Sequence, residues 1–423
     1  MFTQSLTLPI RTICMLAVVS ATFAASATVR AQQLERRDTV AERARPKLDA
    51  DGVPVGAMRL YPELAAEWRY DDNIFADDAM KQSDTLIRAI PELRLRSRSP
   101  RHRAELGGNL DVARYADFDS EDYEDLRLWA IGDRAVRNGR IQGELKFSDI
   151  HEDRTSPDDV RGTELTEFSQ NSVYGAYTHQ PGKLLIRIDG RYRAVDFGST
   201  QTATGVIDNN DRDRNTVDVG LRGGYEMSPD YAVYAEGRFD KVDYDQSFDR
   251  NGFQRSSDGV ELRLGTLLDF SGRTSGEFYV GYLRREYDDA RFSVVDGPSF
   301  GGEIAWNASH LTTLTLGASR TIESTTIVGA AGITRTAVRI QADHELFRNL
   351  LLNADFAYTN DNFENIDRTD DITRFRLGGR YMMNRYLHIL FGYQYQNRDT
   401  SPMSSSGQIY KINELFFRVT GQL

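Results

Sequence analysis

The sequence lacks several features on which membrane and secreted proteins often depend. Its 423 residues contain a single cysteine, Cys14, in an N-terminal segment that we expect to be removed, so the mature chain has no disulfide and no cysteine metal site. After the N-terminus, no apolar run approaches the ~20 residues that a membrane helix needs. Lysine is rare and acids outnumber bases, giving a formal net charge of −11, which argues against nucleic acid as a partner.

The N-terminus has the pattern of a secretion signal. Arg11 supplies a positive charge, Ile13–Ala25 is a short apolar core, and two small-residue cleavage patterns follow, the second ending at Ala31. We expect cleavage after Ala31, so that residues 1–31 are a signal peptide. Removing Arg11 and Arg30 leaves 50 basic residues against 63 acids, a mature charge of 50 − 63 = −13.

Residues 32–57 differ from everything that follows. The segment begins with charged residues and is then interrupted by Pro46, Gly52 and Pro54, which break regular structure. We expect a flexible periplasmic N-terminal segment. A partner-docking segment, or a plug folded into a pore, remains open as an alternative.

The last nine residues predict a strand that needs a partner. Leu415, Phe417, Val419, Gly421 and Leu423 are apolar or small, and the residues between them are mostly polar. A period of two indicates a strand with one apolar and one polar face. Because the chain stops on this strand, its edge must be paired, and a closed outer-membrane barrel pairs its last strand with its first.

The same alternation recurs along the chain. Clear examples are 183–196, 215–227, 258–270 and 372–383, where one face is apolar and the other carries closely spaced charges of both signs. This pattern is typical of barrel strands with lipid outside and a polar lumen inside. The charged residues that we expect to line the lumen are Arg187, Asp189, Arg191, Arg193, Arg222, Glu226, Arg238, Glu261, Arg263, Asp269, Arg374, Arg376 and Arg380.

Turn signals divide the region after residue 57 into hairpins. They recur at roughly 40-residue intervals, about the length of two membrane strands and a long loop. The turns are Ser99-Pro100-Arg101, Asn138-Gly139-Arg140, Gln180-Pro181-Gly182, Ser228-Pro229-Asp230, Ser271-Gly272-Arg273, Ala308-Ser309-His310, Phe347-Arg348-Asn349 and Met383-Asn384-Arg385. The hydrophilic stretches between them are 198–213, 245–257, 288–297, 359–371 and 399–408. We therefore predict that residues 58–423 form an all-β, transmembrane, antiparallel up-and-down β-barrel of about 18 strands, within a range of roughly 16 to 20.

The lumenal charges allow two interpretations. Facing rows of opposite charge could create a transverse field and a constriction that selects hydrated solutes or guides an anionic polymer. Alternatively, they are cross-strand ion pairs that fill and stiffen the wall. The excess of arginine over lysine suits rigid binding of carboxylates in either case.

A short motif at the first predicted strand resembles a known family. The stretch from Leu60 to Tyr70, which includes Pro62, leads into Asp71-Asp72-Asn73-Ile74-Phe75. This proline-bearing strand and its Asp-Asp-Asn-Ile-aromatic end resemble the outer-membrane β-barrel porin family (beta-barrel porin type 2), and the similar layout covers about residues 58–423. The resemblance implies an outer-membrane barrel that is the exit pore for an exopolysaccharide.

Enzymatic and metal sites are not indicated. None of the six histidines has a nucleophile and an orienting group at a suggestive spacing, so we expect no catalytic site and no cofactor. Residues 208–213 carry clustered oxygen ligands, but they lack the spacing of a calcium loop, and a solvated acidic loop is the simpler interpretation.

These observations give three functional hypotheses. The first is the exopolysaccharide exit pore, which the family resemblance alone supports. The second is a general or solute-selective diffusion porin, and the third is a structural or adhesive barrel acting through extracellular loops. We expect location in the outer membrane of a Gram-negative cell with both termini in the periplasm. The expected partners are outer-membrane lipid and lipopolysaccharide, the barrel assembly machinery and periplasmic polysaccharide-export components.

Overall fold

The structure is a computed structural model that describes residues 39–99, 102–270, 272–402 and 407–423. The predicted signal peptide, residues 1–31, lies outside this part of the chain, as does the beginning of the segment 32–57. Within the described ranges, no helix is long and apolar enough to cross a membrane.

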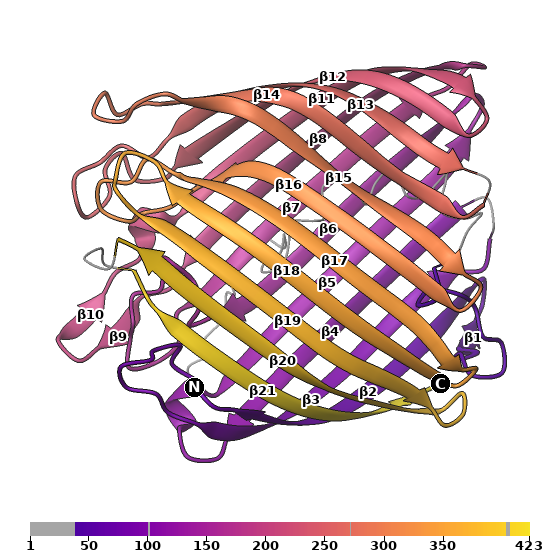
Figure 1. Cartoon of the computed structure of the whole chain (residues 1–423), viewed down its shortest axis with the longest axis horizontal. Helices are drawn as coiled ribbons and strands as arrows, with labels where there is room; N and C mark the ends of the chain where they lie inside the picture. The colour runs from indigo at the N-terminus through magenta and orange to yellow at the C-terminus, as the bar shows by residue number, and fades with distance from the viewer. Residues whose placement is uncertain (1–38, 100–101, 271, 403–406) are drawn as a thin grey trace, which may run out of the picture.

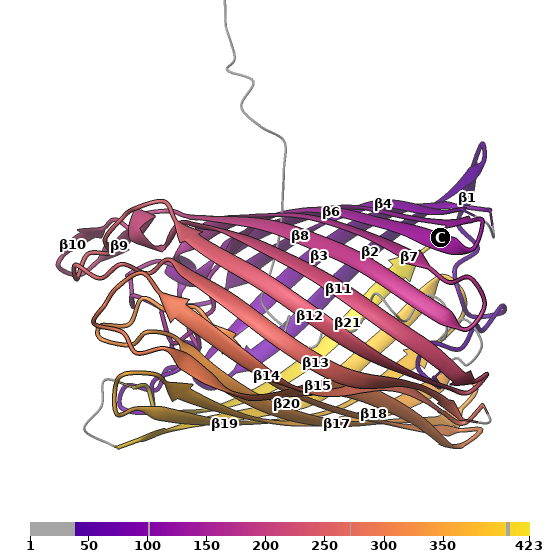
Figure 2. The ribbon, with the colours of Figure 1, turned by 90° about the horizontal axis from the view of Figure 1, so that it is seen from above.

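Eighteen long strands of the described chain form one antiparallel sheet that closes into a barrel (Figures 1 and 2). The last strand pairs with the first, with Glu63 opposite Gln422 at one end and Asp71 opposite Glu414 at the other. The predicted antiparallel barrel of about 18 strands is confirmed. Its strands are β2 (Met58–Asp71), β3 (Asp84–Ser97), β4 (His102–Tyr115), β5 (Tyr123–Val136), β6 (Gly139–His151), β7 (Glu167–His179), β8 (Leu184–Phe197), β11 (Arg214–Ser228), β12 (Tyr231–Tyr244), β13 (Ser257–Phe270), β14 (Thr274–Tyr287), β15 (Val295–Ser309), β16 (Thr312–Glu323), β17 (Ile333–Phe347), β18 (Leu350–Phe363), β19 (Thr369–Met382), β20 (Leu387–Ser401) and β21 (Tyr410–Gln422).

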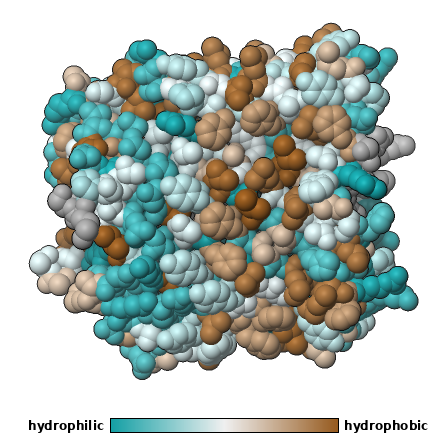
Figure 3. Space-filling model, in the orientation of Figure 1, coloured by the Kyte–Doolittle hydropathy of each residue, from teal (hydrophilic) through white to brown (hydrophobic). Residues whose placement is uncertain are grey.

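Apolar side chains point out of the barrel, and charged side chains point into it. Along β8, Leu184, Ile186 and Ile188 are 55%, 52% and 51% exposed, whereas Arg187 and Asp189 between them are only 6% and 8% exposed. Exposed apolar side chains in such numbers suit a hydrocarbon solvent. Figure 3 shows apolar side chains over the middle of the strands and hydrophilic ones over the end with the long loops, at the left.

Short turns and long loops lie at opposite ends of the barrel, named the turn end and the loop end. All eight predicted turns fall at the short connections, although Pro100, Arg101 and Ser271 lie outside the described residues. At one of them, Asn138 has a φ of 57°, the left-handed conformation that a tight hairpin turn needs. The connections at the loop end are 72–83, 116–122, 152–166, 198–213, 245–256, 288–294, 324–332, 364–368 and 402–409.

Several strands extend further at the loop end than the sequence predicted. Residues 359–371 were expected to be a loop, but β18 continues to Phe363 and β19 begins at Thr369. Beyond the apolar band both faces of a strand meet water, so polar residues such as Asn360 and Asn362 occur on a strand without ending it. Hydrophobic alternation therefore marks only the part of a strand that faces lipid.

Five small elements supplement the barrel. Strand β1 (Val53–Val55) pairs with the start of β2 at the turn end. At the loop end, the loop 198–213 contains the hairpin of β9 (Thr200–Thr202) and β10 (Gly205–Ile207) and the 3-10 helix η4 (Asn210–Arg212). A second 3-10 helix, η3 (Asp119–Glu121), lies between β4 and β5.

The described residues before β1 run along the turn end of the strands β16–β20. Val40 is fully buried against Leu351 and Met382, and its backbone N–H donates to the Thr313 hydroxyl at 2.9 Å. Arg45 forms an ion pair with Glu345 at 2.9 Å. The beginning of the described chain is thus attached to strands from its last third.

Candidate functional site

A network of paired charges covers the lumenal face of β11–β13. The buried carboxylate of Glu236 contacts the guanidinium groups of Arg222 at 3.0 Å, Arg238 at 2.8 Å and Arg263 at 3.7 Å. Arg238 also contacts Asp189 of β8 at 3.0 Å. Because each charge has partners of opposite sign, this part of the wall matches the stiffening interpretation.

Other sequence-predicted charges also lie on the lumenal face with nearby partners. Their partners lie on the same strand, two strands away or, in one case, at a turn. The contacts are Arg187 with Asp189 (3.5 Å), Arg191 with Glu144 (3.7 Å), Glu226 with Gln180 (3.2 Å) and Glu261 with Arg263 (2.5 Å), while Asp269 is 7% exposed.

Three arginines of β19 form a different surface, named the arginine face: Arg374, Arg376 and Arg380. Arg374 and Arg376 donate from Nε to the amide oxygens of Gln396 and Gln394, each at 2.9 Å. Within the described part of the chain, no carboxylate oxygen lies within 4.0 Å of any of the three, and the same holds for Arg193 on β8. Their positive charge is therefore available to solutes in the lumen, as the selectivity interpretation requires.

A buried carboxylate joins the strands on both sides of the closing seam. The Glu67 side chain is fully buried and contacts Arg69 at 2.9 Å, Arg88 at 2.7 Å and Arg418 at 2.6 Å. These arginines belong to β2, β3 and β21, the first two strands and the last. Glu67 is not among the charges predicted from the sequence, because a single glutamate in an alternating strand does not show which arginines will lie beside it.

The family-like motif Asp71–Phe75 lies at the loop end of the same seam. The Asp72 carboxylate accepts hydrogen bonds from the backbone N–H and side-chain amide of Asn413 at 2.7 and 2.9 Å. Asn73 is fully buried and donates to the backbone carbonyl of Lys411 at 3.1 Å. Ile74 is buried beside it, and Phe75 packs edge-on against Phe118, with 5.3 Å between ring centroids. The motif thus ties the start of the first loop to β21.

The loop 152–166, named the mouth loop, is held by two buried bidentate ion pairs. Arg154 contacts Glu121 at 2.6 and 2.9 Å, and Glu152 contacts Arg212 at 2.6 and 2.9 Å. All four side chains are less than a tenth exposed. Bidentate pairing between charged groups fixes both position and orientation.

The mouth loop also reaches the far wall of the barrel. The Asp158 carboxylate accepts hydrogen bonds from the Thr325 hydroxyl at 2.8 Å and the Thr326 backbone N–H at 2.9 Å, both in the loop between β16 and β17. Arg398, on β20, donates to the Thr155 carbonyl at 2.8 Å. In Figure 1 these strands lie in front of β6 and β7, from which the mouth loop arises, so the loop crosses the opening.

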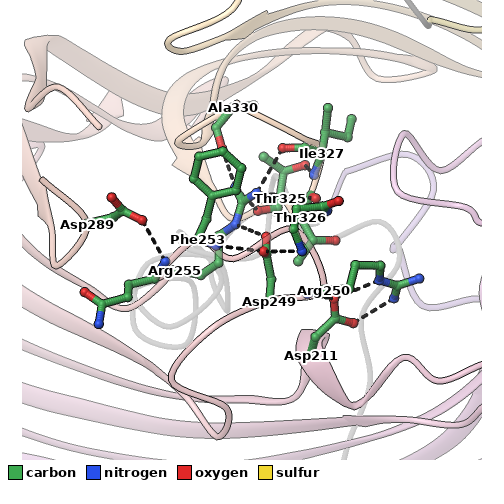
Figure 4. Close-up of polar contacts among 12 residues, drawn as sticks. Asp211, Asp249, Arg250, Phe253, Arg255, Asp289, Thr325, Thr326, Ile327 and Ala330 are labelled. Carbon is green, nitrogen blue, oxygen red and sulfur yellow. Dashed lines mark hydrogen bonds and ion pairs between the residues drawn. The ribbon is translucent and has the colours of Figure 1, made fainter. Parts of the chain in front are cut away.

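A buried arginine of a third loop strengthens this crossing (Figure 4). The Arg255 guanidinium is 2% exposed and donates to the backbone carbonyls of Thr325 at 3.2 Å, Ile327 at 3.1 Å and Ala330. It also forms an ion pair with Asp249 at 2.8 Å. The loops after β6, β12 and β16 are therefore joined by polar contacts over the lumen.

Burial raises the pKa of two carboxyl groups in the loops. Desolvation raises the pKa of Asp159, in the mouth loop, to about 6, with Glu152 adding to the rise and Arg154 opposing it. Burial also raises the pKa of Asp213 to about 6, against a hydrogen bond from the Phe197 backbone N–H. Both groups change protonation between neutral and mildly acidic pH.

The acidic stretch 208–213 is solvated only in part. Asp211 is 5% exposed and forms an ion pair with Arg250 at 2.7 Å (Figure 4), and Asn209 is fully buried. The expectation of a solvated loop holds for Asp208 and Asn210, which are exposed, but is wrong for Asp211, because Arg250 of the loop 245–256 neutralises this buried carboxylate. Among the residues that the structure describes, no group of three or more histidine, cysteine, aspartate or glutamate side chains could hold a metal ion.

Comparison with known proteins gives a family and several barrels of solved structure. The family model described as Putative beta-barrel porin 2 matches residues 45–423. The ferric citrate transporter FecA, in its unliganded form, is 11% identical with a TM-score of 0.47, over 87% of this chain and 62% of FecA. OpdQ of Pseudomonas aeruginosa is 12% identical with a TM-score of 0.45, over 86% of this chain and 97% of OpdQ. OccK2 (OpdF) of Pseudomonas aeruginosa, solved with glucuronate, is 12% identical with a TM-score of 0.44, over 86% and 98% of the two chains. No curated protein gives a significant match.

Proposed function

The chain belongs to the Putative beta-barrel porin 2 family, an outer-membrane channel family rather than an enzyme family, and on that premise we propose that it is a channel for small hydrophilic solutes. The observation that carries this proposal is the mouth loop, which crosses the lumen and is fixed by buried ion pairs on several sides. A loop held in this way narrows the passage at the mouth. The passage selects at the mouth, and the arginine face attracts anions along the wall.

The orientation in the membrane is part of the proposal. Outer-membrane barrels have short periplasmic turns and longer extracellular loops. The turn end is therefore the periplasmic end, and the mouth loop lies on the extracellular side. This orientation places the described N-terminal segment and the C-terminal strand end in the periplasm.

An exopolysaccharide exit pore is less well supported. A polymer needs a continuous opening wide enough for its chain, whereas the ion pairs Arg154–Glu121 and Glu152–Arg212 hold the mouth loop across the route. Breaking one buried pair by removing a partner costs about 3–5 kcal/mol, so the loop does not move aside without a ligand or partner that supplies this energy.

Conductance and size exclusion test the proposal. The refolded full-length protein is placed in planar bilayers and in liposomes that report entry of arabinose, maltose or a long dextran. We expect conductance and entry of the small sugars but not of dextran. The variant Arg154→Ala with Asp158→Ala should show larger conductance and a larger size limit, because it removes one anchor of the mouth loop on each side of the lumen.

A matched control separates release of the mouth loop from general damage. Arg284→Ala breaks an ion pair with Glu286 in which both side chains are more than half exposed, so it should leave conductance unchanged. Passage of dextran through the unaltered protein would instead support the polymer exit pore. Absence of current in both the unaltered protein and the loop variant would contradict a channel and leave a structural or adhesive barrel.

A further inference from the structure

A small polar cavity lies inside the lumen beneath the mouth loop. Its volume is about 190 Å³, and it is enclosed by the ends of β2, β5, β6 and β19–β21 together with residues of the mouth loop. Pockets for drug-sized ligands occupy about 300–1,000 Å³, so this one suits a smaller molecule. A solute that passes the mouth loop meets this cavity next.

One side of the cavity carries a positive charge that the protein does not neutralise. Arg376 lines it and donates to the Gln394 amide oxygen, a neutral partner, at 2.9 Å. Among the described residues, no carboxylate oxygen lies within 4.0 Å of this guanidinium. A guanidinium has five N–H donors in a planar fork, and the neutral amide leaves donors free for a ligand carboxylate.

Another side of the same cavity carries a carboxyl group without a cationic partner among the described residues. The Asp71 carboxylate accepts a hydrogen bond from the Asn73 backbone N–H at 2.7 Å. Its cross-strand neighbour is Glu414, a second carboxylate, whose charge is taken up by Arg69 at 2.7 Å. No lysine, arginine or histidine nitrogen of the described chain lies within 4.0 Å of Asp71.

Most of the remaining charged groups around the cavity are already paired. The exception among the described residues is Asp153, whose carboxylate also lines the cavity and accepts hydrogen bonds from the backbone N–H and hydroxyl of Thr155 at 2.7 and 2.6 Å. Arg154 is occupied by Glu121, and His151 contacts Asp125 at 2.8 Å through Nδ1. The Tyr123 ring lies on the imidazole of His151, with 4.0 Å between centroids, and adds an apolar surface to the wall. Among the described residues, the cavity therefore presents one cation without a carboxylate partner, two carboxyl groups without a cationic partner (Asp71 and Asp153), and a flat apolar surface.

We propose that this cavity binds small zwitterions, with the carboxylate of the ligand on Arg376 and its ammonium group on Asp71. A molecule the size of an amino acid carries both charges within a few bonds and supplies each of the two groups with the oppositely charged partner that it lacks. A neutral sugar would leave both charges uncompensated. This inference rests on the proposed function, because the ligand reaches the cavity through the channel.

Three matched compounds test two-ended recognition: L-serine, 3-hydroxypropionate, which lacks the ammonium group, and ethanolamine, which lacks the carboxylate. Titration calorimetry on the refolded full-length protein should show serine binding about tenfold or more tighter than either, the equivalent of one charge-assisted hydrogen bond. Arg376→Gln should reduce serine to the affinity of ethanolamine. Asp71→Asn should reduce it to the affinity of 3-hydroxypropionate.

Controls distinguish failure of the site from failure of the channel. Glu226→Gln alters a lumenal charge at the turn end and should leave serine binding unchanged. The zwitterion site would be overturned if the three compounds bind with equal affinity, or if Arg376→Gln lowers the affinity for all three by the same factor. If ion conductance persists in either case, the channel stands without this site, whereas loss of conductance in the unaltered protein refutes the channel itself.

Discussion

Neutralising Glu67 should weaken the barrel at its seam. In Glu67→Gln the side chain keeps its size but loses its charge, while the guanidinium groups of Arg69, Arg88 and Arg418 stay around it. Arg69 retains Glu414 at 2.7 Å, and Arg88 retains Asp111. Among the described residues, Arg418 alone loses its single carboxylate partner, so we expect the lower end of the range for breaking a buried pair, about 3 kcal/mol.

Equilibrium unfolding in urea, followed by tryptophan fluorescence in lipid vesicles, measures this loss. The double variant Glu67→Gln with Arg418→Gln should recover part of it, because no uncompensated guanidinium then remains at the seam. Glu286→Gln provides the comparison, since its exposed pair with Arg284 should contribute less than about 1 kcal/mol. The reasoning is refuted if Glu67→Gln unfolds at the same urea concentration as Glu286→Gln, or if the second substitution adds its full cost to the first.

Two further predictions concern permeation. Replacing Arg374 and Arg380 with glutamine should lower the preference for chloride over potassium, because neither arginine has a carboxylate partner in the described chain. The reversal potential in a salt gradient measures this preference. An unchanged reversal potential would show that these arginines do not control ion selectivity. Burial raises the pKa of Asp159 from 3.8 to about 6, so the docked mouth loop favours the protonated carboxyl group. The stabilisation of the docked loop by this group is therefore fully present below about pH 3.8 and is lost as the pH rises through about 6. Conductance should therefore be lower at pH 5 than at pH 7, and Asp159→Asn should remove most of this difference.

The barrel could be predicted from the sequence because its pattern is local. Each strand alternates between lipid and lumen, so the facing of Leu184 and Arg187 can be inferred from their immediate neighbours. The turns could be located for the same reason, since residues such as Asn138 adopt backbone conformations set within a few residues. The loop boundaries were less accurate, because apolar alternation ends where the membrane ends and not where the strand ends.

The mouth could not be predicted from the sequence. The stretch 152–166 is polar, the stretch 324–332 is mostly small or apolar, and neither has a period, so nothing within either indicates that Asp158 meets Thr325. Arg255 and Glu67 resemble many other charged residues until the barrel brings their partners together. The two interpretations of the lumenal charges were both open, because the sequence does not show which charges lie beside one another. In the structure the two interpretations apply to separate areas: β11–β13 carry paired charges, and β19 carries the arginine face, whose arginines have no carboxylate partner among the described residues.

The attachment of Val40 has a consequence for the order of folding. Its backbone partner, Thr313, lies 273 residues later, and the contacts of Arg45 with Glu345 and of the Leu48 carbonyl with His388 span 300 and 340 residues. Contacts of such long range form only after the intervening chain is in place. A segment synthesised before every barrel strand therefore reaches its native position among the last, and its burial marks a barrel whose strands up to β20 are already assembled.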